Sequence, residues 1–136
     1  MRSTLIDAGP LIALFDKHDT YHKRALAFIK NNDGPLITTW PVVTEVSHML
    51  DFGTLTQVNF LKWINRGGLH IFELEHAHLN RIIELSEKFM DVPMDLADAT
   101  LIVASEARRI EEIATIDPGF YIYRDVRNQY LNNIFI

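Results

Sequence analysis

The sequence predicts one domain, over residues 1–136, of three-layer α/β architecture with a mainly parallel central sheet and helices on both faces. Short β-prone segments alternate with longer segments of helical period, which is typical of strands joined by helices. A length of 136 residues suits one domain and is too short for two ordinary ones. Hydrophobic residues make up 48% and charged residues 23%, so a packed core is expected.

The N-terminal half shows clear breaks between its expected elements. Asp7-Ala8-Gly9-Pro10 stops a short β-prone run, and Asn31-Asn32-Asp33-Gly34-Pro35 ends a helical stripe. Pro41 suits the first turn of a helix. In chain order, this half is expected to form a strand at 3–6, helices at 11–15 and 18–31, a strand at 36–38, and helices at 41–52 and 55–65.

The C-terminal half continues the alternation. Gly67-Gly68 ends the preceding helix, and the mostly apolar segment 95–109 is expected to cross the interior as a helix. The tail from residue 124 is expected to dock on the body, and the tryptophans, phenylalanines and C-terminal tyrosines to serve mainly in packing. This half is expected to form a strand at 69–74, helices at 76–89 and 95–109, and strands at 113–116 and 120–123.

Composition restricts the class of function. The chain has no cysteine, which excludes disulfides, thiolate metal sites and a cysteine nucleophile. The N-terminal segment reaches an acid before any signal-like apolar stretch, and no run approaches the ~20 apolar residues of a membrane span. We therefore expect a cytoplasmic protein with no membrane partner. The formal charge of -5 argues against broad, sequence-blind adhesion to nucleic acid.

Four acids lie next to apolar segments and need an explanation. Asp7 and Asp117 each follow a predicted strand, at the edge of a parallel sheet where ligands bind. Glu45 lies in the apolar start of one helix, and Asp98 lies in the apolar start of another. A buried carboxylate needs a cation, a hydrogen-bond donor or a raised pKa. Clustered carboxylates bind Mg²⁺ or Mn²⁺, so the four acids predict a divalent-metal site.

Helix capping is the alternative explanation for each acid taken singly. Asp7 and Asp117 both have the form of N-caps, and Asp117 precedes a proline. Asp95 is a candidate cap, with Asp98 as an acid favoured by the helix dipole three residues later. Glu45 is a candidate surface acid whose carboxylate reaches solvent. The metal interpretation depends on the four acids converging.

These residues, in this order, resemble the motifs of the PIN domain family, and within it the VapC-like ribonuclease toxins of type II toxin-antitoxin modules. The likeness extends over nearly the whole chain. The matching segments are Leu5-Ile6-Asp7-Ala8-Gly9-Pro10, Thr44-Glu45-Val46, Leu96-Ala97-Asp98-Ala99-Thr100, and Ala114-Thr115-Ile116-Asp117-Pro118-Gly119-Phe120.

The resemblance implies an activity and a set of roles. Asp7 and Asp98 would be the main metal ligands, and Glu45 and Asp117 would complete the site directly or through water. Thr115 would be a supporting hydroxyl, and Asp95 would share or replace part of the role of Asp98. The implied reaction is hydrolysis of RNA phosphodiester bonds by metal-activated water. An antitoxin protein and a homodimer are also implied by the resemblance only.

Two other functions remain open from the sequence. A phosphatase or phosphotransferase would use Asp7 as a nucleophile, but Asp7-Ala8-Gly9 lacks the second carboxylate of an Asp-x-Asp motif. A catalytically inactive PIN-like regulatory or scaffold protein would keep the acids and bind RNA or a protein partner without turnover.

Overall fold

Five parallel strands form the centre of the computed structural model, which describes residues 2–136. Their spatial order is β3-β2-β1-β4-β5, so β1 has hydrogen-bonded neighbours on both sides. All three residues of β1 are buried, as expected for the central strand of a covered parallel sheet. The strands are β1 (Thr4–Ile6), β2 (Leu36–Thr38), β3 (His70–Ile71), β4 (Glu112–Ala114) and β5 (Asn132–Asn133).

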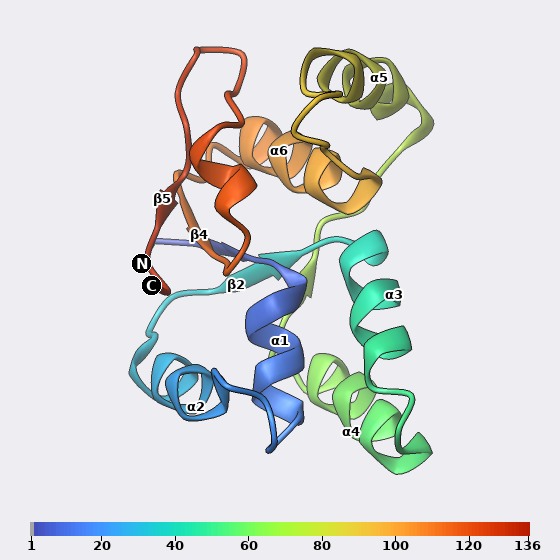
Figure 1. Ribbon diagram of the computed structural model, residues 1–136, viewed down its shortest axis with the longest axis vertical. Helices are drawn as coiled ribbons and strands as arrows, with labels where there is room; N and C mark the ends of the chain where they lie inside the picture. Colours follow the sequence, from blue (N-terminus) through green and yellow to red (C-terminus); the bar gives the residue numbers. More distant parts are fainter. Residues whose placement is uncertain (1) are drawn as a thin grey trace.

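Helices cover both faces of this sheet (Figure 1), which confirms the predicted three-layer fold class. One layer contains α1 (Ala8–Phe15) and α2 (His22–Asn31), and the opposite layer contains α5 (Leu79–Lys88) and α6 (Leu96–Arg108). The helix α3 (Trp40–Met49) contacts both α1 and α6, and α4 (Thr54–Asn65) follows it. Two short 3₁₀ helices complete the chain, η1 (His76–His78) and η2 (Pro118–Tyr121).

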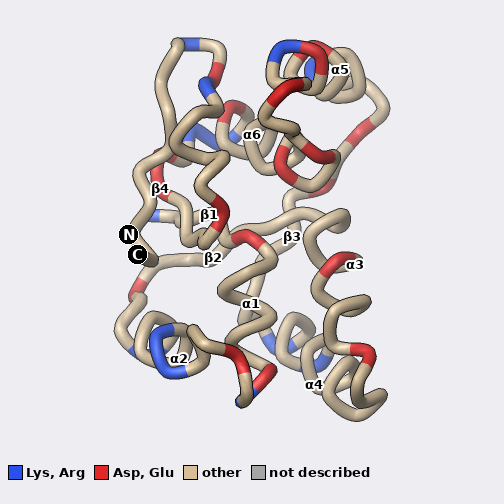
Figure 2. Tube along the Cα trace, in the orientation of Figure 1, with Lys and Arg blue, Asp and Glu red and all other residues tan. Residues whose placement is uncertain are grey.

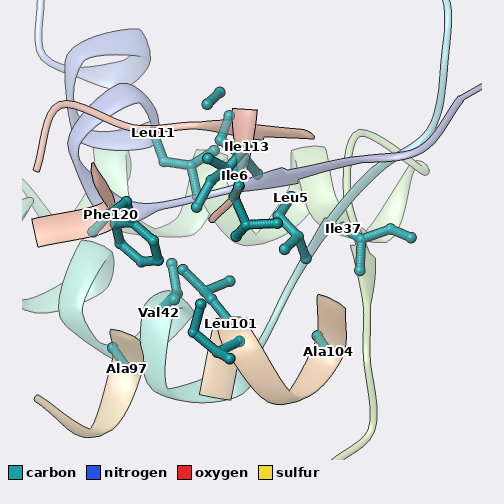
Figure 3. Packing of buried hydrophobic residues seen from close by; sticks show 14 of the residues in the cluster. Leu5, Ile6, Leu11, Ile37, Val42, Ala97, Leu101, Ala104, Ile113 and Phe120 are labelled. Carbon is teal, nitrogen blue, oxygen red and sulfur yellow. The ribbon is translucent and has the colours of Figure 1, made fainter. Parts of the chain in front are cut away.

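The core lies between the central strands and the helices. Every residue of α6 from 97 to 105 is buried, as its apolar sequence predicts. Figure 3 shows Leu101 of α6 and Val42 of α3 near Leu5 and Ile6 of β1. This packing fixes the beginnings of α3 and α6 relative to the end of β1.

The order of the strands creates a crevice at their carboxyl ends. The connections β1 to β2 and β2 to β3 progress to one side of the sheet, whereas β3 to β4 returns past β1 to the other side. Since such crossovers are right-handed, the reversal places the connecting helices on opposite faces. The loops that leave β1 and β4 therefore diverge, and ligand sites form at such a switch point.

The C-terminal region differs most from the predicted elements. Residues 118–121 form the 3₁₀ helix η2 instead of part of a strand at 120–123, because Asp117 caps a turn that begins with Pro118. The outer strand lies in the tail, where β5 pairs with β4. Asparagine is not a β-prone residue, so the sequence gives no signal for a strand at Asn132–Asn133. This edge strand forms through backbone hydrogen bonds with β4.

Other boundaries and some packing expectations also need correction. The predicted helix at 18–31 begins only at His22, the strand at 69–74 shrinks to residues 70–71, and the strand at 113–116 ends at Ala114. Trp63 packs against Phe15 with ring centroids 5.5 Å apart, as a core residue would. Trp40 is 49% exposed, so the expectation that it packs in the core is wrong. None of the helices over residues 2–136 combines the length and hydropathy that a membrane crossing requires.

Candidate metal centre

Asp7 is the first residue after β1, and the fold holds both of its carboxylate oxygens. It is 6% exposed and forms the N-cap of α1, with Oδ1 accepting a hydrogen bond of 2.8 Å from the Ala8 backbone N–H. Its Oδ2 accepts a hydrogen bond of 2.8 Å from the Thr115 hydroxyl. These bonds fix the direction in which the carboxylate faces the switch point.

Thr115 joins the loops that follow β1 and β4. The residue is fully buried, and its hydroxyl accepts a hydrogen bond of 3.0 Å from the backbone N–H of Asp117 while donating to Asp7. The two loops are consequently linked through one oxygen atom. Thr115, for which the resemblance implies a supporting role, therefore lies beside Asp7 and Asp117.

Asp117 is the N-cap of the 3₁₀ helix η2, and Gly119 close to it leaves room for the Tyr123 side chain. Its Oδ1 accepts a hydrogen bond of 2.8 Å from the Gly119 backbone N–H. A Cβ on Gly119 would lie 2.7 Å from the Tyr123 hydroxyl oxygen and 3.1 Å from Asp117 Oδ1. Glycine is thus needed there for Tyr123 to approach the acidic residues.

Asp98 enters the site from α6 on the opposite face of the sheet. Asp95 caps this helix, with its Oδ1 accepting a hydrogen bond of 2.8 Å from the Asp98 backbone N–H. In return, Asp98 Oδ2 accepts a 3.3 Å hydrogen bond from the Asp95 backbone N–H. The same Oδ2 accepts a 2.9 Å hydrogen bond from the Tyr123 hydroxyl.

Tyr123 is the residue of this site that sequence reasoning missed, since it was expected to pack the last strand and tail. It is 1% exposed and touches Phe89 and Phe120 by its ring edge, with centroids 5.4 Å and 5.0 Å apart. A buried tyrosine needs a hydrogen-bond partner for its hydroxyl. The need for such a partner could have pointed to Tyr123 as a residue of the site. It does not identify which acid accepts the hydrogen bond.

Three acids converge in space. Asp7, Asp98 and Asp117 each offer an oxygen, and these oxygens lie within 4.8 Å of one another. We call these residues the acid cluster. Glu45 and Asp95 are exposed and outside the acid cluster, yet all five acids line one cavity of about 280 Å³.

Burial and mutual repulsion favour the protonated forms of the two buried acids. Burial raises the pKa of Asp7 to about 6, against the opposing effect of the hydrogen bonds from Ala8 and Thr115. Burial also raises the pKa of Asp98 to about 7, opposed by the Tyr123 hydroxyl and increased by Asp95 and the other cluster acids. A nearby positive charge would favour the ionised form of both carboxyls, and most of all that of Asp98.

Two neighbours of the buried acids, Glu45 and Tyr123, also have raised pKa values. Partial burial raises the pKa of Glu45, and the nearby charges of Asp95 and Asp117 add to the shift although Glu45 is largely exposed. Burial and the Asp98 carboxylate raise the pKa of Tyr123, so its hydroxyl remains a donor. Among the described residues, no Lys or Arg lines the cavity. Figure 2 shows basic positions on α2 and around α5, away from the start of α1.

Capping and convergence occur together in this site. Asp7, Asp95 and Asp117 all cap helices, as the capping interpretation predicts. A carboxylate has about four lone-pair sites, so a capping bond leaves others for a cation. An all-oxygen donor set without a neighbouring Lys or Arg fits a hard divalent ion such as Mg²⁺ or Mn²⁺.

Solved structures of two toxin systems share this fold. The structure matches that of VapC20 from Mycobacterium tuberculosis, a Sarcin-Ricin loop cleaving toxin, with a TM-score of 0.81 and 16% identity over 88% of this chain and 93% of that chain. It also matches VapBC2 from Rickettsia felis bound to a DNA fragment from their promoter, with a TM-score of 0.66 and 15% identity over 96% of this chain and 98% of that chain. No protein-family model and no curated protein sequence matches. The likeness establishes the PIN-like fold expected from the motifs.

Proposed function

Starting from the fold shared with the VapC structures, we propose that this protein is a metal-dependent endoribonuclease and the toxin of a toxin-antitoxin pair. The observation that carries the proposal is the convergence of Asp7, Asp98 and Asp117 within 4.8 Å. Asp7 and Asp117 come from the loops that follow β1 and β4, Asp98 comes from the first turn of α6, and the three meet at the sheet's switch point. Capping alone does not require them to meet.

Asp7 and Asp98 are the proposed principal ligands for Mg²⁺ or Mn²⁺, because both are buried and held by fixed donors. Asp117 completes the acid cluster, and Glu45 and Asp95 face the same cavity at a greater distance, where they can act through water. A bound divalent cation would activate water and stabilise negative charge on the phosphate oxygens.

The protein's own groups position the metal ligands and control their protons. Thr115 directs one oxygen of Asp7, and Tyr123 directs one oxygen of Asp98. Because the pKa values of Asp7 and Asp98 are raised to about 6 and about 7, cation binding must displace protons at mildly acidic pH. The cutting rate should therefore fall as the pH is lowered below 7.

The remaining partners follow from the same proposal. An antitoxin would inhibit by placing a cationic side chain in the acidic cavity, which the described Lys and Arg residues leave unoccupied. Homodimer formation would cover exposed apolar residues such as Leu55 of α4, which is 71% exposed. A cytoplasmic location accords with an RNA substrate.

The test compares wild type with Asp7→Asn on a labelled single-stranded RNA, in Mg²⁺, in Mn²⁺ and in EDTA. We expect cutting that requires the metal and falls at least ~100-fold in the variant, since a ligand has been neutralised. Asp33→Asn is the matched control, because Asp33 is exposed and does not line the cavity.

Three results would contradict the proposal. One is equal cutting by Asp7→Asn, which would assign the activity to a contaminant. Another is undiminished cutting in EDTA. The third is RNA binding without cutting in either metal, the behaviour of a scaffold protein.

A further inference from the structure

A second, more apolar cleft lies directly beside the acidic cavity. Its volume is about 630 Å³, and its walls come from one face of α3, from Trp40 to His48, and from the start of α6. Glu45 and Asp95 line both spaces, so the cleft adjoins the acid cavity. A ligand that reaches the acid cluster therefore has an open neighbouring surface to occupy.

Trp40 is the largest apolar group in this cleft. Its side chain is 49% exposed, and Leu96 across the cleft is 57% exposed. The nearby Thr44 hydroxyl donates to the Trp40 carbonyl oxygen at 3.0 Å, so this polar group is already used. The cleft thus offers a flat, apolar surface next to two carboxylates.

The two walls are held at a fixed spacing. Thr39 precedes Trp40, and its hydroxyl makes a 2.7 Å hydrogen bond with the hydroxyl of Thr100 in α6. Thr39 is fully buried and Thr100 is 1% exposed, so this bond is shielded from water. This bond joins the start of α3 directly to α6, so the cleft is pre-formed.

The charges around the cleft restrict what can bind there. Among the residues that the structure describes, no Lys or Arg lines either space, and Glu45 and Asp95 line both. The imidazole of His48 lies farther along α3, one helical turn beyond Thr44 and two beyond Trp40. A phosphate group would be repelled beside Glu45 and Asp95. A nucleobase is flat, uncharged and suited to an indole face, and such stacking tolerates any base identity.

We propose that Trp40 stacks on one unpaired base of the RNA, adjacent to the phosphodiester bound at the acid cluster. This inference rests on the proposed nuclease function and narrows its substrate class to RNA that is single-stranded at that position. A paired base cannot present its face to a side chain without leaving the helix.

The first experiment couples a change in the protein to a change in the RNA. A single abasic nucleotide is moved along a single-stranded oligonucleotide, and kcat/KM is measured for wild type and Trp40→Leu. Leucine keeps an apolar side chain but removes the aromatic face. In wild type, the abasic nucleotide should lower kcat/KM by about 5- to 100-fold at one position beside the cut.

The same abasic substrate should be cut by Trp40→Leu at the same rate as the intact RNA, since the stacking partner is already missing. Trp40→Phe should recover part of the loss, which separates stacking from a structural defect. Tyr130→Leu is the matched control, because Tyr130 is 59% exposed and outside both spaces. Equal abasic penalties in wild type and Trp40→Leu would overturn the inference while leaving the nuclease proposal intact.

A binding measurement decides the question without turnover. Tryptophan fluorescence of Asp7→Asn is titrated with RNA in Mg²⁺ and compared with Asp7→Asn/Trp40→Leu, in which Trp63 is the remaining tryptophan. Quenching in the first protein and none in the second supports stacking, even if wild type cuts no RNA. Saturable RNA binding without quenching would overturn the stacking inference. So would the absence of any RNA binding, or equal quenching in the two proteins.

Discussion

At the residue scale, Asp98 depends on one donor that comes from outside its own helix. Tyr123 lies 25 residues away in sequence and directs Asp98 Oδ2 with a 2.9 Å hydrogen bond. This bond stabilises the ionised form of Asp98 and opposes the raised pKa that burial produces. Tyr123 is therefore a positioning residue for Asp98, one of the proposed metal ligands.

Replacing Tyr123 with phenylalanine tests this role. The ring would still fill its place between Phe89 and Phe120, but Asp98 would lose the hydrogen bond from the Tyr123 hydroxyl and its pKa would rise further. We expect Mn²⁺ affinity at pH 7 to fall about 10- to 100-fold, as for other residues that orient a metal ligand. Isothermal titration calorimetry with Mn²⁺ measures the change.

The control is Tyr121→Phe, since Tyr121 is 49% exposed and its hydroxyl lies 3.5 Å from the Asn133 amide nitrogen. This variant should bind Mn²⁺ like wild type. An unchanged affinity in Tyr123→Phe would show that Asp98 is held by its own helix alone.

At the element scale, the helix beginnings direct the acids. Asp7 caps α1, Asp95 caps α6 and Asp117 caps η2, so each loop ends in a fixed carboxylate. The exposed N–H groups at a helix beginning carry partial positive charge, which favours a nearby anion. The caps therefore offset part of the repulsion among the acids before any cation binds.

A substitution at Gly119 in η2 tests whether the close approach of Tyr123 to the capped Asp117 is needed for metal binding. In Gly119→Ala, the added Cβ would overlap the Tyr123 hydroxyl at 2.7 Å and crowd Asp117 Oδ1 at 3.1 Å. We expect Tyr123 to move away from Asp98, with Mn²⁺ affinity lowered at least ~10-fold. The same calorimetric titration measures it, with thermal unfolding recorded in parallel.

Gly53→Ala is the comparison for a glycine change far from the acid cluster. Its added Cβ would meet the Thr56 hydroxyl oxygen at 3.2 Å, far from the acid cluster, so wild-type metal affinity is expected. If Gly119→Ala binds Mn²⁺ normally, Tyr123 and Asp117 can rearrange without cost, and the close approach has no role in the site.

The helices and strands also show which structural features can be predicted from neighbouring residues in the sequence and which cannot. Breaks such as Asp7-Ala8-Gly9-Pro10 are made by neighbouring residues, and the helices and inner strands lie close to their predicted places. The strand expected at 120–123 is wrong because the cap at Asp117 overrides the β propensity of the aromatic residues that follow. The short β5 depends on a partner strand 20 residues earlier, Glu112 pairing with Asn132.

At the scale of the whole molecule, the acids make stability depend on pH and, under the proposed function, on metal. Folding raises the pKa values of Asp7 and Asp98 from 3.8 to about 6 and about 7. Between pH 4 and pH 7 the folded protein therefore holds protons that the unfolded chain releases. That contribution to stability is fully present below pH 4 and is lost as the pH rises through 6 and 7.

We expect a corresponding pattern in thermal unfolding. With EDTA present, the Tm of wild type should fall relative to that of Asp98→Asn as the pH rises from 5 to 8, since asparagine does not ionise. Mg²⁺ should raise the wild-type Tm, and more at pH 8 than at pH 5, because protons no longer compete for the ligands. Differential scanning calorimetry at four pH values measures both trends.

Asp33→Asn should follow wild type throughout, because Asp33 is exposed and lies outside the acid cavity. A Tm difference between wild type and Asp98→Asn that does not change with pH would mean that Asp98 is already ionised in the folded protein. An equal effect of Mg²⁺ at pH 5 and pH 8 would likewise contradict proton displacement.

The amino-acid sequence alone determined the α/β class, the positions of the inner elements and the candidacy of Asp7, Asp98 and Asp117. These follow from periodicity, turn residues and acids beside apolar runs, all of which act over a few residues. The roles proposed for these acids, for Glu45 and for Asp95 await the experiments above.

Only the tertiary structure decided which acids meet. The pairing of β1 with β4 brings Asp7 beside Asp117 and Thr115, while α6 returns Asp98 from the other face and Glu45 stays at the rim. The same packing buries Tyr123 against Asp98 and leaves Trp40 exposed. The physical reason is that strand order and burial are set by hydrogen bonds and packing between segments far apart in the chain, which local sequence patterns do not encode.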